Sequence, residues 1–229
     1  MPPHKPSGTR PSGRNIGVRV KTSAKRSVSS TRWLERQLND PYVAEAHKLG
    51  LRSRAAFKLM QLDERFHLLA RGRRVVDLGA APGGWTEVVV KKVGDGGKVV
   101  ALDILEMAPV AGASVMQADF LDETVPERLR ALLDGPADIV LSDMAAPTTG
   151  HQATDHLRIM ALAEAAYVFA AEVLAPGGAF ICKLFQGGAE RDLLEQLKRD
   201  FVQVRHAKPP ASRADSAETY IVATGFRRS

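Results

Sequence analysis

Alternating strand and helix patterns constrain the fold of this chain more than any other feature. The first unit is the apolar run Arg74–Gly79, which ends in a glycine-rich turn and leads into a helical pattern from Trp85 to Lys92. Further helical patterns lie near 123–133, 153–174 and 188–199. Strands that alternate with helices pair in parallel, which predicts an α/β fold with a doubly wound sheet. The strand patterns are Arg74–Gly79, Lys98–Leu105, Ser114–Asp119, Ala137–Asp143, Gly178–Leu184, Phe201–His206 and Glu218–Phe226.

The last two strand patterns differ from the others in their connection. Only a loop containing Lys208-Pro209-Pro210 separates them, and it shows no helical pattern. A parallel pair needs a crossover segment, whereas an antiparallel pair can be joined by a loop. We therefore expect seven strands in a mostly parallel sheet whose last strand is antiparallel.

A helical stripe precedes the first strand and carries a lysine at its border. Between Arg54 and Leu69 the apolar residues recur at spacings of three and four, which is typical of a helix that packs one face against a core. Lys58 lies at the edge of this stripe.

The loop after the first strand has the composition of a ligand-binding turn. In the segment Asp77–Trp85 the glycines allow a sharp turn and a close approach of backbone to ligand. Pro82 removes a backbone donor that a pyrophosphate would use, which favours a ligand without phosphates. Asp103, ending the second strand, is placed to accept hydrogen bonds from ribose hydroxyls. Asp119, ending the third, either binds an adenine amino group or caps the next helix.

Three charged residues are expected to meet at the same edge of the sheet. Asp143 follows the apolar run of the fourth strand, and Lys183 lies near the end of the fifth. Glu218 opens the last strand, whose antiparallel direction brings its beginning beside those ends. A lysine inside an apolar strand needs a partner, because an unpaired buried ammonium is costly. The residues form either a reactive cluster or an ordinary buried ion pair.

Taken together, these segments resemble the FtsJ/RrmJ family of RNA ribose 2′-O-methyltransferases. The resemblance covers roughly residues 32 to 226 and implies a Rossmann-like class I methyltransferase fold. It also implies a uridine in large-subunit ribosomal RNA as the substrate, methylated late in ribosome assembly. The segments that carry it are Ser53–Leu59, Asp77–Trp85, Ser142–Pro147, Lys183–Gly187 and Ser216–Tyr220.

The resemblance also implies roles for individual residues. The cofactor is S-adenosylmethionine, which is converted to S-adenosylhomocysteine, and no metal is required. Because the methyl group on a sulfonium is already activated, positioning and one general base are enough, and we expect Lys183 to be that base. The catalytic tetrad falls on Lys58, Asp143, Lys183 and Glu218. The cofactor contacts fall on Gly83, Trp85, Asp103, Asp119 and Asp143.

The positive charge is concentrated at the N-terminus. Residues 1–34 hold eight of the 32 Lys and Arg residues and no acid, which leaves 24 basic against 26 acidic residues, a balance of −2. We interpret 1–31 as a disordered basic tail that binds RNA phosphates, followed by the catalytic domain 32–229. A solubilising tail and an organellar transit peptide are the alternatives.

Other features restrict the class of protein. No apolar run is long enough to cross a membrane, and Cys182 is the only cysteine, so we expect a cytoplasmic protein without intrachain disulfides. We also expect a monomer. Cys182 would also be the only nucleophile for a cytosine-5 methyltransferase, but neighbouring strand residues face opposite ways, so it cannot share the substrate face with Lys183. His151 and His156 lack further ligands for a metal site.

Two alternatives remain open at this stage. The substrate ribose could belong to tRNA, or the protein could be a ribosome-assembly factor whose RNA binding matters more than its catalysis. Several basic residues near the predicted site are candidate phosphate contacts. These residues are Arg32, Arg36, Lys48, Arg52, Arg54, Lys208 and Arg213.

Overall fold

The computed structural model describes residues 31, 34–35, 37–147, 149–185 and 190–227. Of the predicted tail 1–31, all but residue 31 lies outside the described residues. The chain divides by its internal contacts into two units, Met1–Glu45 and Ala46–Ser229. The boundary falls inside helix α2 (Pro41–Lys48). Every residue of the candidate site described below belongs to the second unit.

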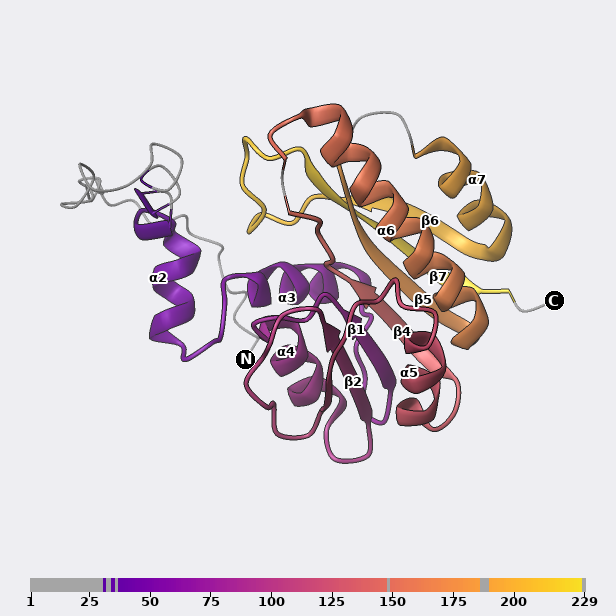
Figure 1. The fold of residues 1–229 in the computed structure, drawn as a ribbon. Helices are drawn as coiled ribbons and strands as arrows, with labels where there is room; N and C mark the ends of the chain where they lie inside the picture. Colours follow the sequence, from indigo (N-terminus) through magenta and orange to yellow (C-terminus); the bar gives the residue numbers. More distant parts are fainter. Residues whose placement is uncertain (1–30, 32–33, 36, 148, 186–189, 228–229) are drawn as a thin grey trace, which may run out of the picture. The chain divides into compact units, whose positions relative to one another are not determined.

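Seven strands form one sheet, with the order β3-β2-β1-β4-β5-β7-β6 (Figure 1). The prediction of an α/β fold with a seven-stranded sheet is confirmed. Sequence order reverses between β1 and β4, which is where open α/β sheets bind ligands. The strands are β1 (Arg74–Leu78), β2 (Lys98–Asp103), β3 (Ser114–Gln117), β4 (Ala137–Ser142), β5 (Leu174–Phe185), β6 (Phe201–Ala207) and β7 (Glu218–Phe226).

Strand β7 is antiparallel to both of its neighbours, as its loop connection predicts. It lies between β5 and β6, and all other pairs in the sheet are parallel. In the β5–β7 register Lys183 is opposite Tyr220, and Phe185 is opposite Glu218. The start of β7 therefore lies at the carboxyl end of β5, where the sequence places Glu218.

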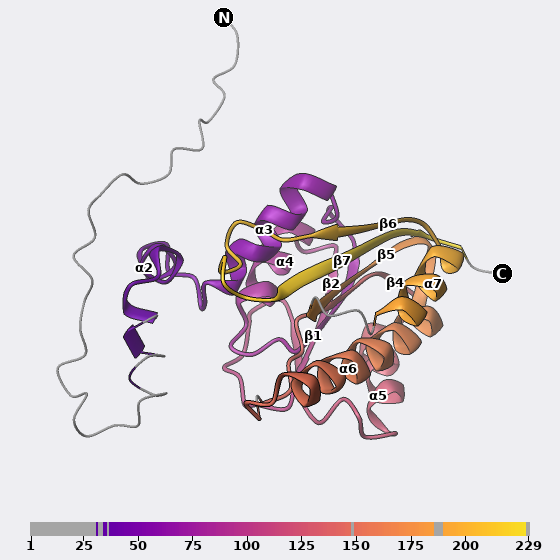
Figure 2. The same ribbon diagram turned by 90° about the horizontal axis from the view of Figure 1, so that it is seen from above.

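Helices cover both faces of the sheet and enclose two apolar cores. Helices α3 and α4 pack on one face, while α5, α6 and α7 pack on the other (Figure 2). The first core includes Leu59 and Leu62 of α3, and the second includes Leu129 and Leu133 of α5. The sheet is thus covered on both sides, as expected for parallel strands. The helices are α3 (Ala55–Phe66), α4 (Gly84–Val93), α5 (Val125–Leu133), α6 (Gln152–Val173) and α7 (Arg191–Asp200).

Two elements end earlier than their apolar patterns suggest, and side chains explain both endings. Helix α3 stops at Phe66 rather than Leu69, because His67 adopts a left-handed conformation at φ 53° and the Asp63 carboxylate accepts the Leu69 N–H. Strand β2 stops at Asp103 rather than Leu105. Its Asp103 carboxylate accepts the Leu105 N–H at 2.8 Å and turns the chain.

Helix α6 is the longest helix of the fold, with 22 residues. It buries Met160 and Ala163 in the core with residues of β4 and β5, while Leu157 and Val168 are exposed. Its length therefore reflects packing along β4 and β5. Among the described residues, no helix combines the length and the apolar composition needed to cross a membrane.

Candidate active site

The predicted site residues line the carboxyl edge of the parallel strands. The glycine-rich loop (residues 79–84) follows β1, and Asp103 ends β2. Asp119 comes two residues after β3, and Asp143 comes directly after β4. The carboxyl ends of parallel strands meet at one edge, so topology alone gathers these groups.

The glycine-rich loop needs glycine for conformation and for space. Gly79 has φ 77°, and a Cβ there would lie 2.6 Å from the backbone nitrogen of Met144. Its N–H donates to the Leu102 carbonyl at 2.8 Å. Gly83 has φ 103° and occupies the N-cap of α4. Both positions favour glycine, and the loop packs directly on the segment that follows β4.

Asp103 fixes the shape of the glycine-rich loop. One carboxylate oxygen accepts the Ala81 N–H at 2.8 Å, and the other accepts the Leu105 N–H at 2.8 Å. A carboxylate accepts about four hydrogen bonds, so Asp103 keeps the capacity to accept further ones. Asp119 is exposed, and it accepts the Leu121 N–H at 3.0 Å. Asp119 therefore makes a turn and still presents carboxylate to solvent.

Trp85 is placed differently from the other predicted cofactor residues. Its indole is buried, and its Nε1–H donates to the Ala55 carbonyl at 2.8 Å. Its ring packs on Tyr220 with centroids 5.7 Å apart. The Trp85 side chain thus joins α4 to α3 and β7.

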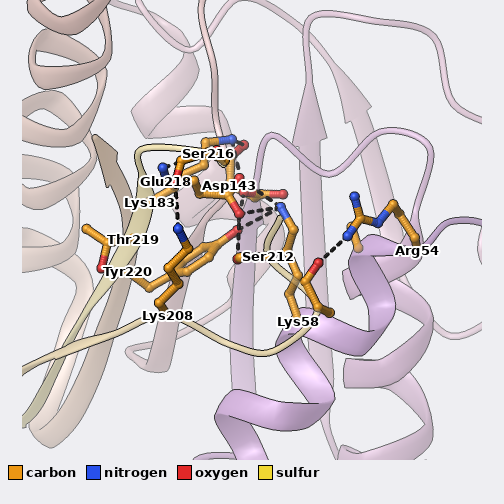
Figure 3. A network of polar contacts seen from close by, with 12 residues as sticks. Arg54, Lys58, Asp143, Lys183, Lys208, Ser212, Ser216, Glu218, Thr219 and Tyr220 are labelled. Carbon is orange, nitrogen blue, oxygen red and sulfur yellow. Dashed lines mark hydrogen bonds and ion pairs between the residues drawn. The ribbon is translucent and has the colours of Figure 1, made fainter. Parts of the chain in front are cut away.

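The two predicted lysines and two predicted acids come together in one cluster (Figure 3). Lys183 Nζ lies 3.0 Å from a carboxylate oxygen of Asp143 and also donates to the Asp143 carbonyl. Lys58 Nζ lies 2.8 Å from each carboxylate oxygen of Glu218. All four side chains are mostly buried. The sequence prediction that these residues converge is therefore confirmed.

Tyr220 connects the two ion pairs and was not predicted as a site residue. Its hydroxyl donates to Asp143 at 2.8 Å and accepts from Lys58 at 3.2 Å. Residues two apart in a strand share a face, so the position of Tyr220 after Glu218 was a usable signal. We call Lys58, Asp143, Lys183, Glu218 and Tyr220 the lysine–acid cluster.

The charges of the cluster fix the protonation of its buried groups. Burial acts to raise the pKa of Asp143, but the charges of Lys183 and Lys58, together with the hydrogen bonds from Lys183 and Tyr220, outweigh it, so this pKa lies below the ordinary value. Burial, followed by the charges of Asp143 and Glu218, raises the pKa of Tyr220 well above 10. Asp143 is thus an anion and Tyr220 a neutral hydrogen-bond donor near neutral pH.

Asp77 is a second buried acid, beneath the glycine-rich loop. One oxygen accepts the Thr86 hydroxyl at 2.7 Å, and the other is buried without a hydrogen-bond partner among the described residues. Burial, with smaller contributions from the charges of Asp143 and Asp103, raises the pKa of Asp77 to about 7. Sequence patterns gave no sign of this shift, because Asp77 looks like any acid near the end of a strand.

The loop before β7 (residues 208–217) holds Glu218 in position. The Ser212 hydroxyl donates to the Glu218 carboxylate at 2.7 Å, and the Glu218 N–H donates to Ser216 at 3.1 Å. Lys208 Nζ donates to the Ser216 carbonyl at 2.6 Å, and the Arg54 guanidinium donates to the Ala211 carbonyl. Arg54 and Lys208, predicted as phosphate contacts, thus have structural contacts within the protein.

Cys182 lies on the opposite face of β5 from Lys183. It is buried in the core formed with α5, α6 and α7, and burial raises the pKa of its thiol to about 12. A neutral thiol in a core is a poor nucleophile. In the part of the chain that the structure describes, no group of three or more His, Cys, Asp or Glu side chains is arranged to hold a metal ion.

The chain is similar to known methyltransferases. The family model described as FtsJ-like methyltransferase matches residues 51–226, which contain the glycine-rich loop and the lysine–acid cluster. A Paramagnetospirillum magneticum protein named Ribosomal RNA large subunit methyltransferase E is 65% identical over 97% of this chain and 94% of its own length. An Azorhizobium caulinodans protein of the same name is 64% identical over 96% of this chain and 92% of its own length.

A solved structure supports the fold assignment. The chain is similar to a Plasmodium falciparum protein described as a candidate ribosomal RNA methyltransferase, with a TM-score of 0.67 and 30% identity. The match covers 76% of this chain and 98% of that one. The similarity therefore extends over almost the whole of the solved domain.

Proposed function

Because the chain belongs to the FtsJ-like methyltransferase family, we propose that it methylates the ribose 2′-hydroxyl of a uridine in large-subunit ribosomal RNA. The methyl donor is S-adenosylmethionine, and the product is S-adenosylhomocysteine. The relatives named Ribosomal RNA large subunit methyltransferase E support this substrate. We further propose that the protein acts late in ribosome assembly, as a cytoplasmic monomer.

The chemistry of the strand ends suits this cofactor. The carboxylates of Asp103, Asp119 and Asp143 line one edge of the sheet, where they disfavour phosphate groups and favour a cation with hydroxyl donors. S-adenosylmethionine carries a sulfonium and ribose hydroxyls, and it has no phosphate. Gly83 brings the start of α4 to this edge, while Asp103 keeps free acceptor positions for hydroxyl donors.

The lysine–acid cluster is the observation that carries the proposed reaction. When bound, the cofactor supplies a methyl group on a sulfonium, whose leaving group is a neutral thioether. Among the described residues Lys183 Nζ contacts Asp143 alone, through the carboxylate and the carbonyl. These contacts hold the amine in place and leave its remaining hydrogen-bonding position for a substrate oxygen. Lys183 Nζ would accept the proton of the substrate 2′-hydroxyl, and the bound cofactor would supply the methyl group to that oxygen.

The remaining residues of the cluster hold Lys58 in position and balance its charge. Glu218 holds Lys58 through both carboxylate oxygens, and Tyr220 joins Lys58 to Asp143. Lys58 therefore stays beside Asp143, where its ammonium stabilises negative charge that develops on the attacking oxygen.

Replacing the proposed base tests this mechanism. We expect Lys183→Ala to lower methyl transfer to large-subunit particles by about 10²- to 10⁴-fold, with binding of S-adenosylhomocysteine retained. Lys92→Ala is the matched control, because Lys92 forms an ion pair with Asp63 away from the cluster. Near-normal transfer by Lys183→Ala would show that this assignment is wrong.

The substrate and the alternative functions are tested in cells. Mapping ribose methylation across total RNA from a deletion strain should show loss at one large-subunit uridine. An unchanged ribosomal RNA map would redirect the search to tRNA. Full rescue of subunit assembly by Lys183→Ala would favour an assembly factor that acts through RNA binding.

A further inference from the structure

Arg52 links two loops at the carboxyl edge of the sheet. Its Nη1 donates to the Ala108 carbonyl at 2.6 Å, and its Nη2 donates to the Pro109 carbonyl at 2.5 Å. Nη1 also lies 3.5 Å from the Pro82 carbonyl, at the outer limit of a hydrogen bond. The guanidinium thus contacts both the β2–β3 loop (residues 104–113) and the glycine-rich loop.

The rest of Arg52 is anchored to helix α4. Its backbone N–H donates to a Glu87 carboxylate oxygen at 3.0 Å, and its Nε lies 3.6 Å from the other oxygen. Glu87 is in the first turn of α4, directly after the glycine-rich loop. A planar guanidinium held at its base can direct its remaining N–H groups only at fixed positions.

The same two loops are also joined by Asp103. Asp103 accepts an N–H from Ala81 on one side and from Leu105 on the other. At Gly83, a Cβ would lie 2.9 Å from Arg52 Cδ and 3.1 Å from Met107 Sδ. The glycine-rich loop and the β2–β3 loop therefore close tightly around Arg52.

We propose that Arg52 is a positioning residue that sets the affinity for the methyl donor by holding these two loops in their binding geometry. This inference rests on the cofactor site of the proposed function. Loops that are already ordered lose less conformational freedom when a ligand binds, and this raises affinity. Because its N–H groups are directed at protein carbonyls, Arg52 is a poor candidate for a phosphate contact.

The test compares Arg52→Lys and Arg52→Ala with wild type by calorimetric titration of S-adenosylhomocysteine without RNA. Arg52→Lys keeps the charge but loses the planar donor geometry, so both variants should bind on the order of 10-fold more weakly, as for lost charged hydrogen bonds. Arg73→Ala is the matched control. Arg73 pairs with Asp138 at 2.9 Å just before β1, at the other end of the sheet, so only thermal stability should fall.

RNA binding distinguishes the proposal from a phosphate contact. With S-adenosylhomocysteine saturating, we expect both Arg52 variants to keep the wild-type salt dependence of binding to an RNA fragment. A reduced salt slope with unchanged cofactor affinity would overturn the proposal, because a lost phosphate contact lowers that slope. Wild-type cofactor affinity in Arg52→Lys would also overturn it. Neither measurement needs methyl transfer, so its outcome is independent of the test on Lys183.

Discussion

The two ends of the site are built from different parts of the polypeptide. The proposed cofactor end is largely backbone, because the contiguous glycine-rich loop is shaped by its own dihedral angles and by the Ala81 N–H, which donates to Asp103. The lysine–acid cluster is made of side chains from α3, β5, β7 and the segment after β4. The first end should therefore be sensitive to added atoms, and the second to the loss of single polar groups.

The two buried acids of the site show the same contrast in their electrostatics. Asp143 has two lysines and a tyrosine as partners, and its pKa lies below the ordinary value. Among the described residues Asp77 has only the Thr86 hydroxyl to offset burial, and its pKa rises to about 7. Burial alone does not decide the charge of a carboxyl group, because the partners that share its environment determine which form is favoured.

The largest effect on cofactor affinity is expected from adding one methyl group to the backbone-built end. In Gly79→Ala the Cβ would lie 2.6 Å from Met144 N at a φ of 77°. We expect cofactor affinity to fall by about 100-fold and the free energy of unfolding by about 3 kcal/mol. Calorimetric titration and urea unfolding measure the two effects.

Gly177→Ala is the control for backbone strain alone. Gly177 has φ 81°, and nothing lies within 4 Å of the position that a Cβ would take there. The variant should lose about 1 kcal/mol of stability and no cofactor affinity. Equal losses of cofactor affinity and of stability in Gly79→Ala and Gly177→Ala would contradict a role for loop packing against Met144.

An intermediate effect is expected from removing one hydroxyl from the lysine–acid cluster. Tyr220→Phe keeps the ring against Trp85 but removes the hydroxyl that bonds to Asp143 and Lys58. Turnover should fall about 10-fold, because these hydrogen bonds to charged groups are lost, while cofactor affinity stays within about twofold. Steady-state kinetics separate the effect on turnover from the effect on cofactor affinity. Tyr167→Phe loses a hydroxyl contact with Asp200 far from the cluster and should keep full turnover.

The smallest effect at neutral pH is expected for Asp77→Asn, which mimics the protonated acid. The folded pKa of Asp77, about 7, lies above the unfolded value of 3.8. The stability that this group contributes is complete below the unfolded pKa and is lost as pH rises through about 7. Asp77→Asn should lack this pH-dependent contribution. Its free energy of unfolding should therefore fall less than that of wild type between about pH 5 and about pH 8. Identical pH profiles by urea unfolding would contradict the raised pKa.

Particular residues show why parts of the site were predictable. The pairing of Lys183 with the start of β7 follows from strand direction, and the loop without a helix before β7 indicated that direction. The same reasoning could have predicted Tyr220, because residues two apart in a strand share a face and Tyr220 lies two residues after Glu218. The contacts of Arg52 could not be predicted, because its partners are backbone carbonyls 30 to 57 residues away. Every residue has a backbone carbonyl, so such partners leave no pattern in a sequence.

The sequence by itself determined the order of strands and helices, the glycine-rich loop and the set of charged residues at strand ends, because periodicity and backbone sterics are local properties. Only the tertiary structure decided which lysine pairs with which acid, that Tyr220 joins them, and that Asp77 and Asp143 have opposite pKa shifts. Ion pairing and desolvation depend on distances between segments far apart in the chain, and folding alone sets those distances.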